Sequence, residues 1–342
     1  MRATTLLLGF FIISIEPLLS EQKADLDWWA FQKITRPEIP KSENSRNSKP
    51  IDAFILSELE KNKIRLSPKS SQEELIKRIY YDLIGLVPSY ERVQQFVNNK
   101  DIDGYEKLVD ELLGSSHFGE RWARHWLDVV RYAETNGYER DAVKPNIWKY
   151  RDWVIKAFNS DMPYDQFIKE QLAGDEIDNR TESSVIATGM LRAGTWNDEP
   201  NDPQEYKYER LEDMVDVVST AFLGLTVRCA RCHDHKFDPI PQVDYYRMAT
   251  AFWAGTIDPG GGSEMGGPNA KQLGHKGVFG WTDIYRKPPP LHLLINGDPH
   301  KKSFVVKPGN LSFSAHINRP IIDPPKDSKT SWRRRQLAEY IT

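Results

Sequence analysis

The sequence predicts a mainly α-helical protein, in which a multi-helix domain is followed by a small segment that contains β-strands. Three observations lead to this fold class. Apolar residues recur every three or four positions along most of the chain, several of these stretches open with a capping residue, and glycine-rich and then β-like sequence begins near residue 257. With 342 residues, 39% of them hydrophobic and 28% charged, the chain has the composition of a globular protein that is long enough to bury a core.

The first three helices are marked by the residues that precede them. Pro50 stands before an apolar pattern that begins at Ile51, Ser71 opens a capping box with Glu74, and Ser89 caps the next stretch. Further helices are expected at about residues 104–113, 119–134, 147–158, 164–172, 207–223 and 243–254. In the helix at 119–134, periodicity predicts one apolar stripe made of Trp122, Trp126, Val129, Val130 and Ala133.

The sequence after residue 257 has a different character. Gly260, Gly261 and Gly262 indicate a loop, and the β-like runs 291–295 and 303–306 flank the turn signal Asn296-Gly297-Asp298-Pro299. Residues 335–342 form a helical pattern that stops after two turns, as expected of the truncated start of a following domain.

The chain is therefore expected to divide into five parts. They are a signal peptide (1–20), an N-terminal arm whose aromatic residues dock on the body (21–48), a helical domain (49–256), a Gly/Pro-rich linker with short β-strands (257–330), and the truncated start of a following domain (331–342).

The first twenty residues read as an export signal. Arg2 gives a short positive region, residues 6–15 are apolar over a length typical of a signal peptide, and Ser20 is a small residue before the expected cut. No later segment is long and apolar enough to span a bilayer, so no integral membrane segment is expected after the signal is removed. The net charge of −3 gives no reason to expect nucleic acid as a partner.

The chemistry of the chain is concentrated at its two cysteines. Cys229 and Cys232 are followed by His233, in the CxxCH pattern that attaches c-type haem. Two thiols one turn apart can reach the two vinyl groups of one porphyrin, and the adjacent imidazole then becomes the proximal iron ligand. The pattern predicts covalent haem c with Cys229 and Cys232 as anchors and His233 as a metal ligand.

Two other interpretations of the cysteines remain open. Zinc held by Cys229, Cys232, His233 and His235 has suitable ligand types, although ligands so close in sequence would crowd a tetrahedral site. A redox-active or structural thiol pair is the other alternative, although the neighbouring sequence is not the βαβ pattern in which such pairs are common.

The sixth iron ligand is less defined by the sequence. His125, beside Trp122 and Trp126, is the residue we select as the second metal ligand. A structural histidine is the competing interpretation. Methionine sulfur also binds haem iron, but methionines at helical spacing usually belong to a core; here these are Met190, Met214 and Met248.

The acidic residues and the tryptophans, which can stack on sugar rings, suggest a second kind of function: an enzyme that acts on carbohydrate. An exported hydrolase or lyase that acts on polysaccharide would use paired carboxylates, but no pair can be assigned as acid and base from the sequence. The carboxylates considered are Asp128, Glu134, Asp152, Asp175, Asp234 and Asp238.

Several blocks of the sequence resemble the planctomycete cytochrome-c-associated family of secreted proteins that contains domain of unknown function 1549. The blocks are residues 28–32, 50–55, 81–88, 119–128, 163–167, 171–175 and 229–240. Residues 335–342 resemble the opening of a companion domain of unknown function, 1553. The resemblance implies an exported protein linked to haem and to the handling of complex carbohydrates, and it implies no particular reaction.

The function expected from the sequence is that of an exported c-type haem-binding protein, an electron-transfer or redox module of a larger protein, with a redox partner that the sequence does not identify. The alternatives are the polysaccharide-acting enzyme, with a structural CxxCH region, and a binding or scaffold module with structural zinc.

Overall fold

A computed structural model describes residues 26–41, 49–197, 199–255, 270–317 and 319–342. The expected signal peptide and the glycine-rich stretch around residue 261 lie outside the described residues. The described chain is mainly helical with a small two-stranded sheet near its C-terminal end, which confirms the predicted fold class. None of the described helices is both long and apolar enough to cross a membrane.

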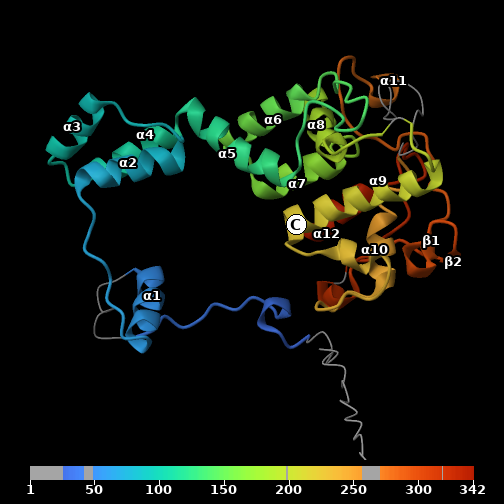
Figure 1. Ribbon diagram of the computed structural model, residues 1–342, viewed down its shortest axis with the longest axis horizontal. Helices are drawn as coiled ribbons and strands as arrows, with labels where there is room; N and C mark the ends of the chain where they lie inside the picture. The colour runs from blue at the N-terminus through green and yellow to red at the C-terminus, as the bar shows by residue number, and fades with distance from the viewer. Residues whose placement is uncertain (1–25, 42–48, 198, 256–269, 318) are drawn as a thin grey trace, which may run out of the picture.

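Three helices form a small bundle at one end of the molecule (Figure 1). They are α2 (Gln72–Leu83), α3 (Tyr90–Asn98) and α4 (Gly104–Leu113), and they follow α1 (Pro50–Lys61). The predicted N-caps are present, because the hydroxyl groups of Ser71 and Ser89 accept hydrogen bonds from the amides of Glu74 and Arg92. The side chain of Glu74 pairs with Arg78, so the reciprocal half of the predicted capping box is not formed. The bundle encloses its own core of Ile76, Ile79, Ile84, Leu108 and Leu112.

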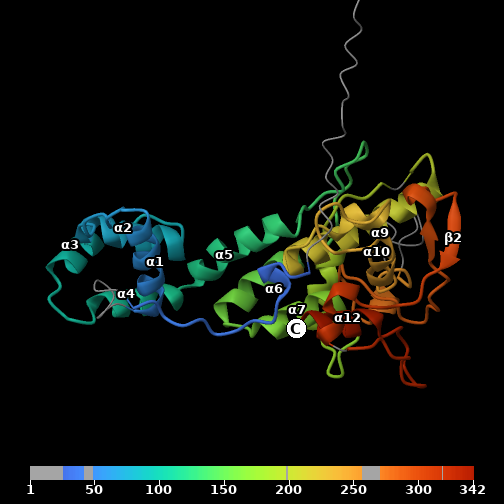
Figure 2. The ribbon, with the colours of Figure 1, turned by 90° about the horizontal axis from the view of Figure 1, so that it is seen from below.

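Helix α5 (Ser116–Val129) runs from the small bundle to the larger body of the molecule (Figures 1 and 2). It packs closely against α6 (Trp148–Asn159): the amide of Gly119 donates to Oδ1 of Asn159 over 2.8 Å, and a Cβ on Gly119 would lie 2.5 Å from the carbonyl oxygen of Ile155.

This close approach decides which face of α5 is buried. The buried residues of the helix are Gly119, Ala123 and Leu127. The predicted stripe is therefore partly wrong, since Trp122 is 38% exposed and Val129 is 54% exposed. Small side chains face α6 because a tryptophan would hold the two helices apart.

The larger body contains the remaining helices. They are α7 (Tyr164–Ala173), α8 (Glu182–Ala187), α9 (Pro203–Val218), α10 (Gln242–Ala249), α11 (Ala270–Leu273) and α12 (Arg333–Ile341). Short 3₁₀ segments are η1 (Trp29–Phe31), η3 (Thr188–Arg192), η5 (Val227–Arg231), η6 (Ile295–Gly297) and η7 (Ser312–Ile317), and η4 (Ser219–Leu223) is a π-turn. The sequence did not predict α8 or η3, which are too short for a periodic pattern.

One large core joins these elements. Met190, Met214 and Met248 are buried in it, as expected of methionines at helical spacing. Residues beyond position 256 belong to the same core, among them Trp281, Leu294 and Leu337. Trp281 and Leu294 belong to the part of the chain expected to be a linker, so this part contributes side chains to the main hydrophobic interior.

The two predicted β-runs form an antiparallel pair, β1 (His292–Leu294) and β2 (Lys302–Val305), in which His292 pairs with Val305 and Leu294 with Lys302. The N-terminal arm makes a smaller contact. The ring of Phe31 lies edge-on to that of Phe313, with centroids 5.2 Å apart, whereas Trp29 is 76% exposed.

Candidate functional site

The CxxCH segment lies on the surface, directly after the long helix α9. The helix continues into the π-turn η4, which Gly224 ends in a left-handed conformation with a φ of +65° before η5 begins at Val227. Cys229, Cys232 and His233 are all exposed, and both thiols are free. The segment therefore presents two accessible thiols and one accessible imidazole.

Ion pairs to α9 fix one side of this segment. Glu212 accepts a hydrogen bond of 2.6 Å from Nε of Arg228, and its other carboxylate oxygen pairs with Arg231. The pair between Glu212 and Arg231 is largely buried, with side-chain exposures of 16% and 14%. Both arginines that flank Cys229 are therefore held by the same carboxylate.

Helix α10 and strand β1 fix the other side. The side-chain amide of Gln242 donates to the carbonyl oxygens of Arg231 (2.9 Å) and Leu294 (3.0 Å), and the hydroxyl of Tyr246 also donates to Arg231 (3.0 Å). A single glutamine side chain thus ties the CxxCH segment to the β-hairpin.

The hairpin turn also touches one of the cysteines. Gly297 has a φ of +72°, and a Cβ at this position would overlap Sγ of Cys232. Nη2 of Arg231 donates to the carbonyl oxygen of Gly297 over 3.2 Å. Position 297 needs glycine for its left-handed backbone and for the close approach of the thiol.

His233 has the hydrogen bonding that suits a metal ligand. Its Nδ1 lies 2.6 Å from the carbonyl oxygen of Asp234, which can only accept, so Nδ1 carries the proton and donates. In the neutral ring, Nε2 then keeps its lone pair. Metal-binding histidines generally use one ring nitrogen for the metal and donate the other N–H to a carbonyl or carboxylate group.

His235 has the opposite arrangement. Its side chain is only 5% exposed, and Nδ1 accepts hydrogen bonds from the amides of Phe237 (3.2 Å) and Asp238 (2.8 Å). Nε2 therefore carries the proton of the neutral ring and donates to Oγ1 of Thr226 over 2.9 Å. Both nitrogens hold the loop in place, so a metal could bind His235 only after these bonds break.

The four residues considered for zinc do not form a compact group. A metal ion would need at least three such ligand atoms close together. Among the described residues, the His, Cys, Asp and Glu side chains that meet this condition, with ligand atoms within 4.8 Å of one another, are Asp175, Glu176 and Asp283.

Those three carboxylates surround an arginine of α12. Arg334 donates to Asp175 at 2.7 and 2.8 Å and to Glu176 at 2.9 Å, and it lies 3.5 Å from Asp283. The guanidinium thus occupies the place where a cation would be held. Burial raises the pKa of Glu176 well above its usual range, although Arg334 opposes this shift.

The same burial bears on the polysaccharide-acting alternative. The side chains of Asp175 and Glu176 have no exposure, so substrate cannot reach them even though a hollow of about 380 Å³ lies beside them. Glu176 also accepts from the amide of Arg335, in the first turn of α12. These carboxylates hold α12 against the body.

His125 lies on the exposed face of α5. Its ring contacts that of Trp122, with centroids 5.7 Å apart. The neighbouring Trp126 points inward and packs on Phe222 of η4, with centroids 5.5 Å apart. Helix α5 therefore contacts η4, the element that precedes the CxxCH segment. Trp126 makes this contact, and His125 does not.

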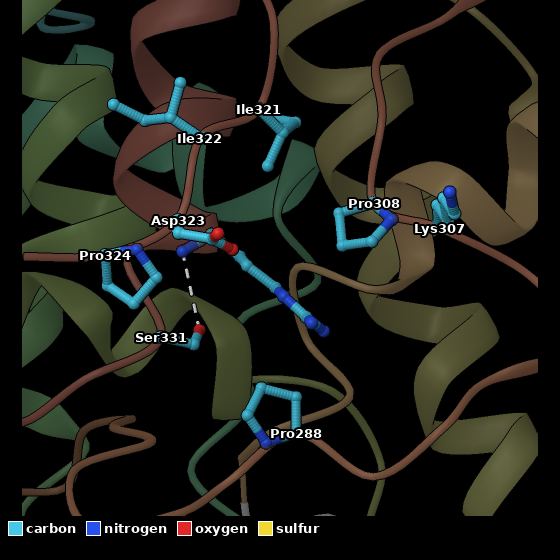
Figure 3. Close-up of a pocket in the computed structure, with 9 residues that line it drawn as sticks. Pro288, Lys307, Pro308, Ile321, Ile322, Asp323, Pro324 and Ser331 are labelled. Atoms are coloured by element: carbon cyan, nitrogen blue, oxygen red, sulfur yellow. Dashed lines mark hydrogen bonds between the residues drawn. The ribbon is translucent and has the colours of Figure 1, made fainter.

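A separate hollow of about 320 Å³ lies among C-terminal segments (Figure 3). Lys307 and Pro308 line one side, Asp323 and Pro324 the opposite side, and Ile322 lies above them in this view. Its walls contain none of the residues proposed from the sequence as a site.

Comparison with known protein families gives a match over most of the helical part of the chain. The family model described as PSCyt2, protein of unknown function (DUF1549), matches residues 50–256, more than half of the chain. No curated protein matches the chain, and no solved structure does. The matched residues include Cys229, Cys232 and His233, whereas Gly297 and Arg334 lie beyond them.

Proposed function

The chain belongs to the DUF1549 family, and from this premise we propose that it is an exported protein that carries one covalent c-type haem on Cys229, Cys232 and His233 and serves as an electron-transfer or redox module. The family assignment agrees with the resemblance seen in the sequence. The family's short name, PSCyt2, adds a cytochrome label without stating an activity.

The state of His233 is the observation that carries the proposal. An accessible imidazole with Nδ1–H bonded to a carbonyl group is oriented to offer Nε2 to iron, and it directly follows the second of two free, exposed thiols. The donor set therefore fits a c-type haem. When bound, the haem supplies a one-electron redox couple.

The protein's own residues have three tasks in this proposal. Cys229 and Cys232 anchor the cofactor, and His233 binds the iron. Glu212 and Gln242 hold the backbone between these groups in place. None of the hollows described above adjoins the thiols, and Phe237 offers an exposed apolar ring in the same loop. Covalent attachment keeps a haem on such an open surface, where a redox partner can approach it.

The decisive experiment is expression with a signal peptide in a host that has cytochrome c maturation machinery. We expect a c-type pyridine haemochrome spectrum, haem that resists acid–acetone extraction, and a haem-bearing peptide that spans residues 229–233. The double variant Cys229→Ala/Cys232→Ala should lose all covalent haem and keep its helical circular dichroism. Lys236→Ala, an exposed change in the same loop, is the matched control. Haem-free wild-type protein that is exported and folded would overturn the proposal.

The sixth ligand has its own test. If His125 binds the iron, His125→Ala should change the low-spin absorption spectrum, whereas His117→Ala, an exposed histidine on the same helix, should not. Identical spectra for the two variants would exclude His125 and leave the proposal for His233 intact.

A further inference from the structure

A second cluster of polar residues lies in the interior, beside α9 and formed by other residues than the CxxCH segment. Asp213 pairs with Nε and Nη2 of Arg131 at 2.6 and 2.5 Å, and with Nη1 of Arg210 at 3.1 Å. Lys144 is the third basic residue, and its Nζ donates to the carbonyl oxygen of Ala193 over 2.6 Å. Three basic side chains thus share one carboxylate within the described part of the chain.

Two of these basic side chains are almost fully buried. Arg210 and Lys144 are each 2% exposed, while Arg131 and Asp213 retain 24%. Among the described residues, Asp213 supplies one negative charge to Arg131, Arg210 and Lys144, so it cannot compensate all three basic side chains. Buried charges are normally paired, because an uncompensated charge is strongly disfavoured in the protein interior.

The electrostatic effect on Lys144 agrees with a surplus of positive charge. Burial first, and then the charges of Arg210, Arg131 and Arg192, lower the pKa of Lys144 from 10.5 to about 7. Asp213 acts in the other direction but does not offset the arginines.

Several hydrogen-bond donors beside these basic side chains have no acceptor. Nε and Nη2 of Arg210 and Nε1 of Trp196 are buried and unpaired in the described structure. The two residues are in direct contact, since the guanidinium lies 4.9 Å from the centroid of the Trp196 ring. Trp196 is 2% exposed. Three unpaired donor nitrogens therefore belong to two residues in contact, in a cluster where basic side chains outnumber carboxylates among the described residues.

We propose that Arg210 and Trp196 bind a small anion of halide size in the protein interior, with Lys144 contributing charge. An anion supplies the acceptor that the three donor nitrogens need and adds negative charge to a cluster in which one carboxylate faces three basic side chains. We choose a single-atom ion because Arg210 and Trp196 are in direct contact, so an acceptor shared by the two residues must be small. The inference does not depend on the haem proposal.

The test is a chloride titration of the full chain at constant ionic strength, with sodium gluconate as the replacement salt. We expect saturable stabilisation: at a chloride concentration a hundred times the dissociation constant, the folding equilibrium constant should rise about a hundredfold. Line broadening of ³⁵Cl in NMR measures the binding independently of unfolding. Bromide should compete with chloride for the site.

Two variants locate the site. Trp196→Phe keeps the ring and removes one donor, and it should weaken chloride binding by about tenfold; Arg210→Met should abolish it. Trp281→Phe is the matched control, because Nε1 of Trp281 is also buried and unpaired. If Arg210→Met does not fold, Trp196→Phe and the NMR measurement decide. Absence of saturable chloride binding in the wild type, or equal binding in Trp196→Phe and Trp281→Phe, would overturn the inference.

Discussion

Glu212 and Asp213 are consecutive residues of α9, and they bind two different sets of arginines. Glu212 pairs with Arg228 and Arg231 of the CxxCH segment, whereas Asp213 pairs with Arg131 and Arg210 in the interior. Two neighbouring carboxylates therefore connect the surface segment and the buried basic cluster to the same turn of the same helix.

This relationship gives a first prediction. Glu212→Ala leaves Arg231 largely buried without its partner, and we expect it to lower the free energy of unfolding by about 2–4 kcal/mol. Urea denaturation followed by circular dichroism measures the change. Glu209→Ala is the control, because Glu209 is exposed on the same helix. Equal stability of the two variants would mean that the ion pairs do not fix the segment.

The two histidines of the CxxCH region should respond differently to substitution. His235→Ala removes a buried ring and its three hydrogen bonds, which should cost about 2–4 kcal/mol of unfolding free energy. His233→Ala should leave stability unchanged and remove the proposed iron ligand. Urea denaturation of the haem-free proteins separates the two effects, and a large loss in His233→Ala would show that this residue is structural.

Gly297→Ala tests the contact between the hairpin and Cys232. The substitution adds a Cβ at a φ of +72° and against Sγ, so we expect a loss of about 2 kcal/mol in unfolding free energy. Combining it with Cys232→Ala should recover the part due to the clash and leave the part due to backbone conformation. A double-mutant cycle measures this coupling, and additive effects would contradict the contact.

Substitution of Arg334 should lower the free energy of unfolding far more than substitution of its neighbour Arg335. Arg334→Met leaves Asp175 and Asp283 buried without their cation, at a cost of about 3–5 kcal/mol. The loss should grow with rising pH, since the remaining carboxylates must then ionise in the interior. Arg335→Met, which breaks a pair with the exposed Asp178, is the control. Thermal unfolding at pH 5 and pH 8 distinguishes them.

The lowered pKa of Lys144 predicts that stability depends on pH between about pH 7 and pH 10.5. In this range the unfolded chain holds a proton on Lys144 that the folded protein has released, because burial and the nearby arginines lower the folded pKa to about 7. The unfolded state binds more protons, so stability rises with pH by up to about 1.4 kcal/mol per unit. Below pH 7 both states are protonated and this contribution is constant.

The comparison with Lys144→Met isolates this effect. Groups that titrate in both proteins, including the two thiols, cancel in the difference. We expect the wild type to gain stability relative to the variant as pH rises, measured by urea unfolding in chloride-free buffer. Parallel stability curves would show that Lys144 keeps its proton across the range.

Much of the secondary structure followed from local signals. Ser71 and Ser89 cap their helices as predicted, and the β-runs on either side of Asn296 pair as expected. These features depend on residues close to one another in the chain, which is why a single sequence reveals them. The helix α8 was missed, because six residues are too few to show a period.

The CxxCH pattern, the helical class and the family resemblance are evident from the amino-acid sequence, because each is carried by short runs of neighbouring residues. The folded arrangement was needed to learn that His233 keeps one ring nitrogen for a ligand while both ring nitrogens of His235 are bonded. It was also needed to learn that Gly119 and not Trp122 faces α6, and that Arg334 joins three carboxylates. The physical reason is that burial and hydrogen-bond partners come from segments far apart in the chain, and no local pattern specifies which of them meet.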